Sequence, residues 1–442
     1  MDRIAEYHTR CAALATGFRD ARSNGQCVGI RKPTSNLFRR RHASGKRLLD
    51  VRSFNHVIGV DSQTRTADVE GMTTYETLVA ESLRHGLLPE VVPQLKTITV
   101  GGAVSGLGIE SSSFKHGLVH ETVQEMDVLT GNGDIVTCSP YENEDLFFGF
   151  PNSYGTLGYA LRLKLRLIPA QPYVYLTHTR FTDPCSFFAH VATACKDGAA
   201  DFVDGTLFSK NEMYVSQAAF AGSAPPPSDY TYMDIYYRSI QSRQDDWLTS
   251  SAYIWRWDTD WFWCSKHFGV QNPLIRVFAK FALNSHSYQI LMRLSQKLLP
   301  ATPEIESVIQ DVHVPAESAP DLWEFLSHEI GIFPVWLCPF RTSAQTYPLC
   351  GLEPDTLYFN FGFWDMIPNP FEYGHYNKLI ESKVAELGGR KGLYSSSYYA
   401  KDTFWSLYNK PLFDGLKKTY DPSGLFPDLY DKCVGESTRS GS

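Results

Sequence analysis

The sequence has no uninterrupted run of about 18 apolar residues, so we expect no membrane-spanning helix. It also lacks the apolar segment of a secretory signal, because charges recur through Arg10, Arg19 and Asp20. These absences predict a cytoplasmic protein that is soluble or that sits on a membrane surface without crossing it. The net charge of −7 disfavours a general nucleic-acid-binding protein.

Cysteine pairs with metal-binding or redox spacing are also missing. The nine cysteines are odd in number, none is spaced Cys-x-x-Cys, and none joins a histidine cluster. This pattern argues against a disulfide scaffold and against a structural zinc site. Reduced thiols in the cytoplasm are the favoured interpretation, and no metal is expected.

What is present is a chain of 442 residues, long enough that two domains are expected. The aromatic content is high, with 9 Trp, 24 Tyr and 27 Phe. Such residues fill cores, and they also line pockets for flat or apolar ligands. The composition changes after Pro169-Ala170-Gln171-Pro172, which marks the first domain boundary.

Several segments predict regular structure. Charge and apolar spacing favour helices over residues 1–22, 74–84 and 143–149. Residues 123–138 predict a hairpin, with a Gly-Asn-Gly turn between two apolar strands. Residues 161–167 alternate leucine with basic residues and predict a half-buried strand.

The most informative segment runs from Thr97 to Gly117 and is rich in Gly and Ser, without regular periodicity. Four glycines occur in the eight residues 101–108. Glycine lets backbone N–H groups approach a pyrophosphate closely. The spacing matches neither a Walker A loop nor a Rossmann fingerprint, and a plain surface loop is the alternative.

The same segment closely resembles the Delta(24)-sterol reductase (Diminuto-like) family, which belongs to the vanillyl-alcohol-oxidase or PCMH-type FAD proteins. The resemblance continues along most of the chain and is weakest over residues 210–330. The matching motifs include Val100-Gly101-Gly102, Gly108-Ile109-Glu110-Ser111-Ser112-Ser113, Lys115-His116-Gly117, Thr130-Gly131-Asn132-Gly133, Gly155-Thr156-Leu157-Gly158, Phe202-Val203-Asp204-Gly205, Pro334-Val335-Trp336-Leu337-Cys338-Pro339-Phe340, Leu393-Tyr394 and Phe426-Pro427-Asp428-Leu429-Tyr430-Asp431-Lys432.

The resemblance implies a set of FAD contacts in three short segments. These residues are Thr99, Gly101, Gly102, Gly106, Ser111, Ser112, Ser113, Gly117, Gly155, Thr156, Gly158 and Ile168. A first phosphate loop would lie at residues 31–36, although solvent exposure is an equal reading for Arg31 and Lys32. His42 would be the nearest candidate for covalent attachment, but the resemblance favours non-covalent FAD and a surface position for His42. The sterol reductases of eukaryotes carry a hydrophobic N-terminal anchor that is absent from this sequence.

Reduction of an isolated alkene needs a hydride, which reduced flavin supplies and NADPH reloads, and a proton donor. No motif identifies that donor. Candidate catalytic residues are Glu110, Tyr394 and Tyr398, with His116 and Asp402 behind them. For each of them, packing or backbone hydrogen bonding is the competing interpretation.

Residues 253–269 contain four tryptophans mixed with charges, and a helix is expected to begin at Pro273. One hypothesis is a lipid-access lid in which residues 253–283 touch a membrane peripherally. The other is an aromatic domain wall with a solvated face. Trp336 and Phe340 either line the cavity above the flavin or pack in the core.

We therefore expect an α+β fold. A PCMH-type, two-subdomain FAD-binding domain would cover residues 1–170 and be completed by 395–435. Residues 171–394 would form an α+β substrate or cap domain, and 436–442 a flexible tail.

The favoured function is FAD-dependent and NADPH-dependent reduction of a lipid C=C bond, in a sterol side chain or a methylene-branched fatty acyl chain. One alternative is an oxidase that transfers hydride from an alcohol or sugar lactone to oxygen. Another is a non-catalytic flavin- or lipid-binding protein.

Overall fold

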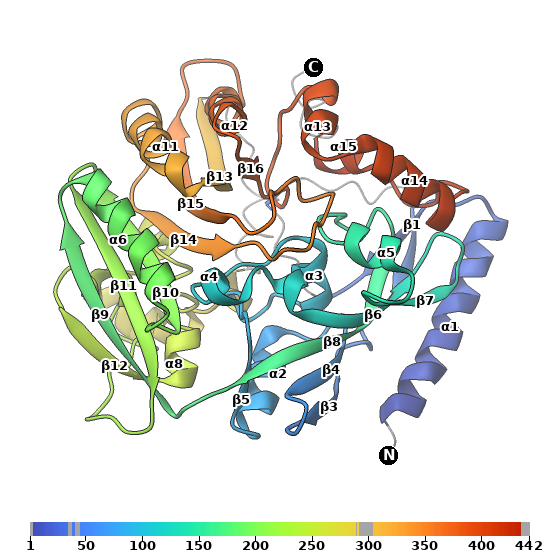
Figure 1. Ribbon diagram of the computed structural model, residues 1–442, viewed down its shortest axis with the longest axis horizontal. Helices are drawn as coiled ribbons and strands as arrows, with labels where there is room; N and C mark the ends of the chain where they lie inside the picture. The colour runs from blue at the N-terminus through green and yellow to red at the C-terminus, as the bar shows by residue number, and fades with distance from the viewer. Residues whose placement is uncertain (1–2, 34–37, 40–44, 289, 291–303, 435–442) are drawn as a thin grey trace.

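The computed structural model describes residues 3–33, 38–39, 45–288, 290 and 304–434. It is a mixed structure of helices and sheets, which confirms the expected α+β class (Figure 1). The predictions for His42 and for the tail 436–442 lie outside the described residues. In the described part, no helix is both long and apolar enough to cross a membrane.

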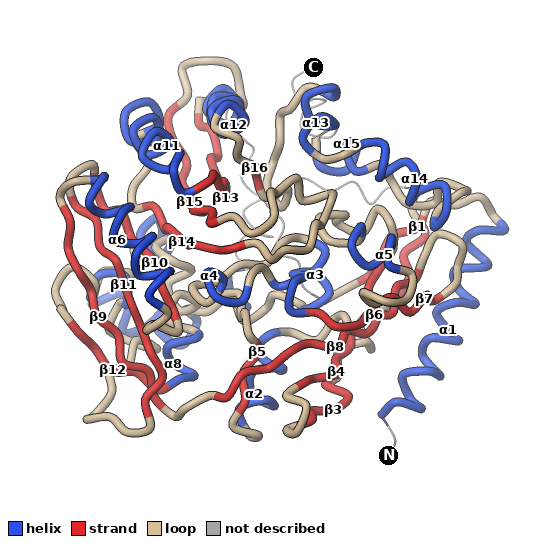
Figure 2. The backbone as a smooth tube through the Cα atoms, viewed as in Figure 1, coloured by secondary structure: helices blue, strands red, loops and turns tan. Residues whose placement is uncertain are grey.

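The first half of the chain is built on a six-stranded antiparallel sheet of order β3-β4-β8-β6-β7, with β5 paired to β8. A parallel pair, β1 and β2, lies beside it (Figure 2). The strands are β1 Val28–Arg31, β2 Arg47–Asp50, β3 Val57–Asp61, β4 Thr66–Glu70, β5 Leu87–Pro89, β6 Val123–Leu129, β7 Ile135–Cys138 and β8 Tyr159–Pro169. The predicted hairpin at 123–138 and the strand at 161–167 are both confirmed.

Helices around this sheet follow from local signals. They are α1 Arg3–Ser23, α2 Tyr75–Leu83, α3 Val100–Ser105, α4 Ser113–His116, the 3-10 helix η1 Val119–Thr122 and α5 Glu144–Gly149. The helix predicted at 74–84 is confirmed, and Thr74 caps it by accepting a hydrogen bond from Thr77 N. The segment predicted to be irregular, 97–118, contains α3 and α4. Gly101 and Gly102 obscured the helical period of α3 because they add no side chain to it, and α4 is only 4 residues long.

The second half is built on an eight-stranded antiparallel sheet of order β12-β9-β11-β10-β14-β15-β13-β16. Its strands are β9 Tyr173–Phe181, β10 Phe202–Ser209, β11 Glu212–Ala221, β12 Asp245–Thr249, β13 Ile305–Pro315, β14 Val335–Arg341, β15 Leu357–Pro368 and β16 Arg390–Lys391. Three helices, α6 Pro184–Asp197, α11 Ala319–Phe325 and α12 His375–Glu386, pack on one face and enclose an apolar core (Figure 1).

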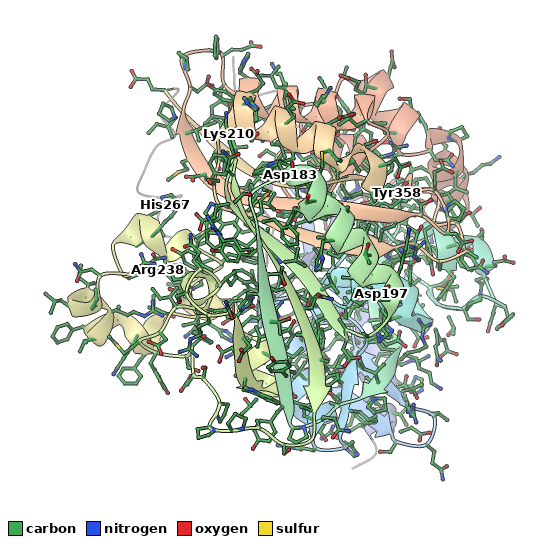
Figure 3. The ribbon with its side chains drawn as sticks, turned by 60° about the vertical axis from the view of Figure 1, so that its left-hand side comes forward. Asp183, Asp197, Lys210, Arg238, His267 and Tyr358 are labelled. Atoms are coloured by element: carbon green, nitrogen blue, oxygen red, sulfur yellow. The ribbon has the colours of Figure 1, made fainter. Side chains whose placement is uncertain are left out.

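Helix α6 shows why these covering helices form where they do. Asp183 caps its first turn, Pro184 occupies the first helical position and Gly198 ends it in the left-handed region. Phe187, Phe188 and Val191 of its inner face are buried on the sheet. Asp183 and Asp197 mark its two ends in Figure 3.

Shorter helices complete the molecule. Those between β11 and β13 are α7 Tyr236–Ser239, α8 Ser250–Ile254, η2 Cys264–Phe268, α9 Pro273–Ala279 and η3 Lys280–Ala282. The turns η4 Ala316–Ser318 and η5 Leu326–Ile330 flank α11. The last helices, α13 Lys401–Leu407, α14 Lys410–Tyr420 and α15 Leu429–Cys433, lie along the first half of the chain, where α14 packs on α5 (Figure 1).

Candidate functional site

A cavity lies between the glycine-rich segment of the first half and aromatic residues of the second half. Its lining residues are Lys32, Phe38, Pro93, Gln94, Leu95, Ile98, Thr99, Gly102, Ala103, Ser105, Gly106, Leu107, Gly108, Ile109, Tyr154, Trp261, Phe262, Cys264, Tyr288, Asp311, Trp336, Trp364 and Tyr394. Backbone of α3 and the residues that follow it therefore forms one wall, and rings form the other.

The glycine wall depends on close backbone packing. An added Cβ at Gly71 would lie 1.9 Å from the carbonyl oxygen of Ala160, and one at Gly101 would lie 2.8 Å from that of Gly71. These two glycines therefore let α3 sit directly on the strands. On the cavity side, a Cβ at Gly106 would lie 3.3 Å from the Tyr154 ring. The segment thus presents bare backbone to the cavity.

Basic residues gather beside this wall. Lys432 of α15 is partly buried and donates a hydrogen bond to the carbonyl oxygen of Tyr154. Burial, together with nearby Arg39, Lys46 and Lys32, lowers the pKa of Lys432 to about 7. Positive charge is concentrated here, and a bound anion would relieve it.

Two buried N–H donors at this end of the cavity have no hydrogen-bond partner within the described residues. They are Nη2 of Arg39 and Nε2 of Gln94. The guanidinium of Arg39 also lies 5.7 Å from the centroid of the Tyr154 ring. A diphosphate would supply both negative charge and hydrogen-bond acceptors, so this donor set fits the anionic part of a dinucleotide cofactor.

The opposite wall is aromatic. The rings of Phe262 and Trp364 are 4.5 Å apart, and those of Phe262 and Trp336 are 5.7 Å apart. The indole N–H of Trp336 donates to Asp204 at 3.2 Å, which fixes this ring with its polar atom pointing to a carboxylate. A wall of this kind binds a flat or apolar group by area rather than by polar contacts.

Asp311 and Tyr394 bring a carboxyl and a hydroxyl into the cavity lining. The Tyr394 hydroxyl lies 2.8 Å from Oδ2 of Asp311, and Nδ2 of Asn360 donates to Oδ1 at 2.7 Å. Burial raises the pKa of Asp311, against those two hydrogen bonds, which lower it. Burial and the adjacent Asp311 raise the pKa of Tyr394 well above its usual value.

A second buried charge cluster ties the two halves together behind the cavity. Arg256 is fully buried and donates to Glu110 at 3.0 Å and to Asp204 at 2.8 Å. Its guanidinium also lies 4.1 Å from the centroid of the Tyr253 ring. Burial raises the pKa of Glu110, although Arg256 opposes that shift. Glu110 does not line the cavity.

The structure brings only some of the family-derived residues to the cavity. Thr99, Gly102 and Gly106 line it. Gly101 faces the strands. Gly155 lies beside Lys432, because an added Cβ at Gly155 would be 3.4 Å from Nζ of that lysine.

The remaining family-derived residues lie elsewhere in the same half, and all of them except the partly exposed Ile168 are buried. Ser111 lies 3.3 Å from Arg256, Ser112 donates to the Glu90 carbonyl oxygen and Ser113 accepts from Glu110 N. Gly117 packs on Glu121, and Gly158 packs on Leu129. Thr156 donates to the Ser153 carbonyl oxygen. Ile168 of β8 pairs with Leu88 of β5.

The candidate catalytic residues are also separated. Tyr394 lines the cavity, but Tyr398 lies outside its lining and donates its N–H to Glu381. Asp402 is exposed in the first turn of α13. His116 lies at the end of α4, and burial lowers its pKa. Trp336 lines the cavity, whereas Phe340 stacks on Tyr358.

Sequence reasoning missed Arg39, Lys432, Asp311 and Arg256. Lys432 ends the family-matching segment 426–432, but nothing there indicates a cofactor contact. The other three sit in no matching motif, and the partners of Arg39, Lys432 and Arg256 lie far along the chain. The Arg39–Lys432 contact spans 393 residues and the Arg256–Glu110 pair spans 146. A lone lysine near a helix end carries no signal that it will be buried among other cations.

Comparison with known proteins agrees with this geometry. Residues 9–139 match a family model described as an FAD binding domain. The chain is similar to human Delta(24)-sterol reductase, at 28% identity over 85% of this chain and 75% of the relative, and to that of Arabidopsis thaliana, at 24% over 94% and 82%. It is also similar to cytokinin dehydrogenase 10 of Oryza sativa subsp. japonica, at 36% over 35% of this chain and 28% of the relative. These matches fit an FAD-linked oxidoreductase with an FAD-binding domain of the PCMH type.

Proposed function

We propose that this protein is an FAD-dependent reductase of an isolated C=C bond in a lipid, with NADPH as the hydride source. The observation that carries the proposal is the cavity itself, in which bare glycine backbone faces a wall of aromatic rings. The names of the sterol reductases that resemble the chain over most of its length support it. Bound FAD supplies hydride transfer; the protein supplies binding, orientation and a dry site.

The cofactor would lie with its ring system along Thr99, Gly102 and Gly106. Its diphosphate would lie near Lys432 and Arg39, whose charge and free donors it would satisfy. Non-covalent attachment remains our proposal. The other family-derived contacts stay predictions, including Ser111, Ser112, Ser113, Gly117, Gly158 and Ile168.

The substrate would be a lipid because the second wall of the cavity is aromatic. Trp261, Phe262, Trp336 and Trp364 offer ring surface, which stabilises apolar chains and offers little to a sugar. A sterol side chain and a methylene-branched fatty acyl chain are the two substrates we propose to test. We also propose a cytoplasmic location, in keeping with nine cysteine thiols.

We further propose that residues 253–283 contact a membrane peripherally. Three tryptophans of this segment, Trp257, Trp261 and Trp263, are buried, and of these Trp261 lines the cavity. The exposed apolar side chains come later, on α9 and η3: Leu274, Ile275, Val277, Phe278 and Phe281. We call this set the α9–η3 face; the adjoining region that carries Arg238 and His267 projects beyond the sheet edge (Figure 3).

The α9–η3 face is close to the cavity. Trp261, which lines the cavity, has its ring 5.8 Å from that of Phe268, just before α9. Lys280 on η3 lies 5.1 Å from the Phe281 ring, which is where a cation would meet lipid headgroups. A lipid could therefore pass from a bilayer to the cavity without crossing open water.

The test is an anaerobic absorbance spectrum of the holoprotein before and after NADPH is added. Bleaching of the flavin band, followed by its return on addition of an unsaturated lipid, is the expected result. An unchanged band with NADPH, but bleaching by an alcohol and peroxide release in air, would replace the proposal with the oxidase function. No reduction by any donor would leave a non-catalytic lipid-binding protein.

A further inference from the structure

Within the proposed reaction, on which this inference rests, we propose that Asp311 and Tyr394 form a two-residue proton relay that protonates the substrate alkene. Tyr394 is the catalytic acid, and Asp311 is the proton reservoir behind it.

The pair lies in the right place. Both residues line the cavity, and both are partly exposed. Asp311 comes from β13, the strand next to the edge strand β16 of the eight-stranded sheet, and its backbone pairs with Gly362 of β15. An added Cβ at Gly362 would lie 2.6 Å from Oδ1 of Asp311, so this glycine makes room for the carboxyl.

The hydrogen bonds determine which oxygen carries a proton. Oδ1 of Asp311 accepts from Nδ2 of Asn360, which favours Oδ2 as the protonated oxygen. In the neutral acid, the proton lies on Oδ2, the oxygen 2.8 Å from the Tyr394 hydroxyl. Oδ2–H then donates to Oη of Tyr394, and the phenolic O–H of Tyr394 is turned into the cavity.

The surroundings favour this neutral state. No cation pairs with Asp311 among the described residues, and burial raises the pKa of its carboxyl. Glu110 differs from Asp311, because its carboxylate pairs with the cation Arg256 and lies outside the cavity lining. Asp311 is therefore the carboxyl that can hold a proton beside the substrate.

The step balances as follows. The alkene takes hydride, with its electron pair, from the reduced cofactor at one carbon. At the other carbon the π electrons take the phenolic proton of Tyr394, while the Asp311 proton moves from Oδ2 to Oη. The product is the saturated chain, and Asp311 is left as a carboxylate that accepts from Asn360 and Tyr394. It regains a proton from solvent when product leaves.

The relay is tested with Tyr394→Phe and Asp311→Asn in the FAD-loaded protein, with Tyr399→Phe as the matched control. Tyr399 is a buried tyrosine of the same segment whose hydroxyl does not line the cavity. The bound flavin is reduced with dithionite, so that NADPH use is not assumed, and mixed anaerobically with the unsaturated lipid. Flavin reoxidation is followed in a single turnover.

We expect reoxidation to slow by about 100-fold or more in Tyr394→Phe and Asp311→Asn, and not in Tyr399→Phe. The FAD content and the rate of flavin reduction by NADPH should match those of the wild type. Reoxidation in both variants within a few fold of the wild type would overturn the relay. A wild-type protein that no unsaturated lipid reoxidises would overturn the proposed function instead, and the relay with it.

A spectroscopic readout is independent of turnover. Infrared difference spectra of the holoprotein, wild type minus Asp311→Asn, should contain the C=O stretch of a protonated carboxyl that shifts in heavy water. Asp311→Asn removes only its own band, since Glu110 and the other buried carboxyls are unchanged. Absence of that band would mean that Asp311 is ionised, which excludes it as the reservoir.

Discussion

Arg276 is the one charged residue within α9, and it points inward to bind Asp260 at 2.7 and 2.9 Å, while apolar residues of the same helix face outward. Arg276 is 1% exposed, whereas Phe278 is 88% exposed and Leu274 is 78% exposed. A helix in water normally has the reverse arrangement. The buried ion pair therefore holds the α9–η3 face outward.

The double variant Phe278→Glu/Phe281→Glu should lose membrane binding. Each phenylalanine contributes about 1.5–3 kcal/mol when it leaves water, so two should change the partition coefficient by about 100-fold or more. The measurement is co-sedimentation with phosphatidylcholine vesicles. The matched control is Tyr141→Glu, at a residue 97% exposed in the turn before α5, which should bind as the wild type does. Equal binding by all three proteins would contradict the proposed membrane contact.

Arg256→Met should destabilise the protein by about 3–5 kcal/mol, because it leaves Glu110 and Asp204 buried without a cation. Urea unfolding measures the loss. Below the raised pKa of Glu110 in the variant, the folded state binds a proton that the unfolded state does not, so the deficit in unfolding free energy should shrink from pH 8 to pH 5. Arg52→Met, which removes only the exposed pair with Asp50, should leave the urea midpoint unchanged. A deficit independent of pH would show that the loss is one of packing.

FAD binding should take up a proton above about pH 7. In the FAD-free protein the pKa of Lys432 is lowered to about 7, and a neighbouring diphosphate would raise it. At pH 8.5 the FAD-bound protein therefore holds a proton on Lys432 that the FAD-free protein lacks. At pH 6 Lys432 is protonated in both states and uptake should vanish. Titration calorimetry in buffers of different ionisation enthalpy measures the uptake. Lys432→Met should abolish it, and the persistence of uptake in that variant would assign the proton to another group.

Gly102→Val should weaken FAD binding by about tenfold or more, since overpacking costs about 1–3 kcal/mol and the new side chain enters the cavity. A Cβ at Gly102 meets only Oγ1 of Thr99, at 2.8 Å, so the fold should survive. Gly415→Val is the control, because nothing lies within 4 Å of the added Cβ there. Flavin fluorescence titration gives both affinities. Equal affinities would remove Gly102 from the cofactor site.

Local signals in the sequence predicted local structure well. The alternation in residues 161–167 and the turn at 131–133 specify the β8 and β6–β7 pairings, because side-chain period and turn chemistry act over a few residues. Family resemblance implies that the glycine-rich segment contacts the cofactor, and its residues Thr99, Gly102 and Gly106 line the cavity.

The other parts of the site could not be predicted from local pattern. Asp311 looks like any acidic residue of an alternating strand, and its role depends on Asn360 and Tyr394, which are 49 and 83 residues away. The four tryptophans of residues 255–263 suggested either a surface lid or an aromatic domain wall. Three of them are buried, and the exposed apolar face lies on α9 and η3. Only tertiary packing separates these two outcomes.

The position of Lys432 has a consequence for biosynthesis. The cation that would meet the cofactor diphosphate belongs to the last described helix, whereas the glycine wall is complete some 300 residues earlier in the chain. A nascent chain on the ribosome could form the first sheet but would lack Lys432, Tyr394 and Asp311 until those segments emerged. Cofactor loading would then be a late event, which follows translation rather than guiding it.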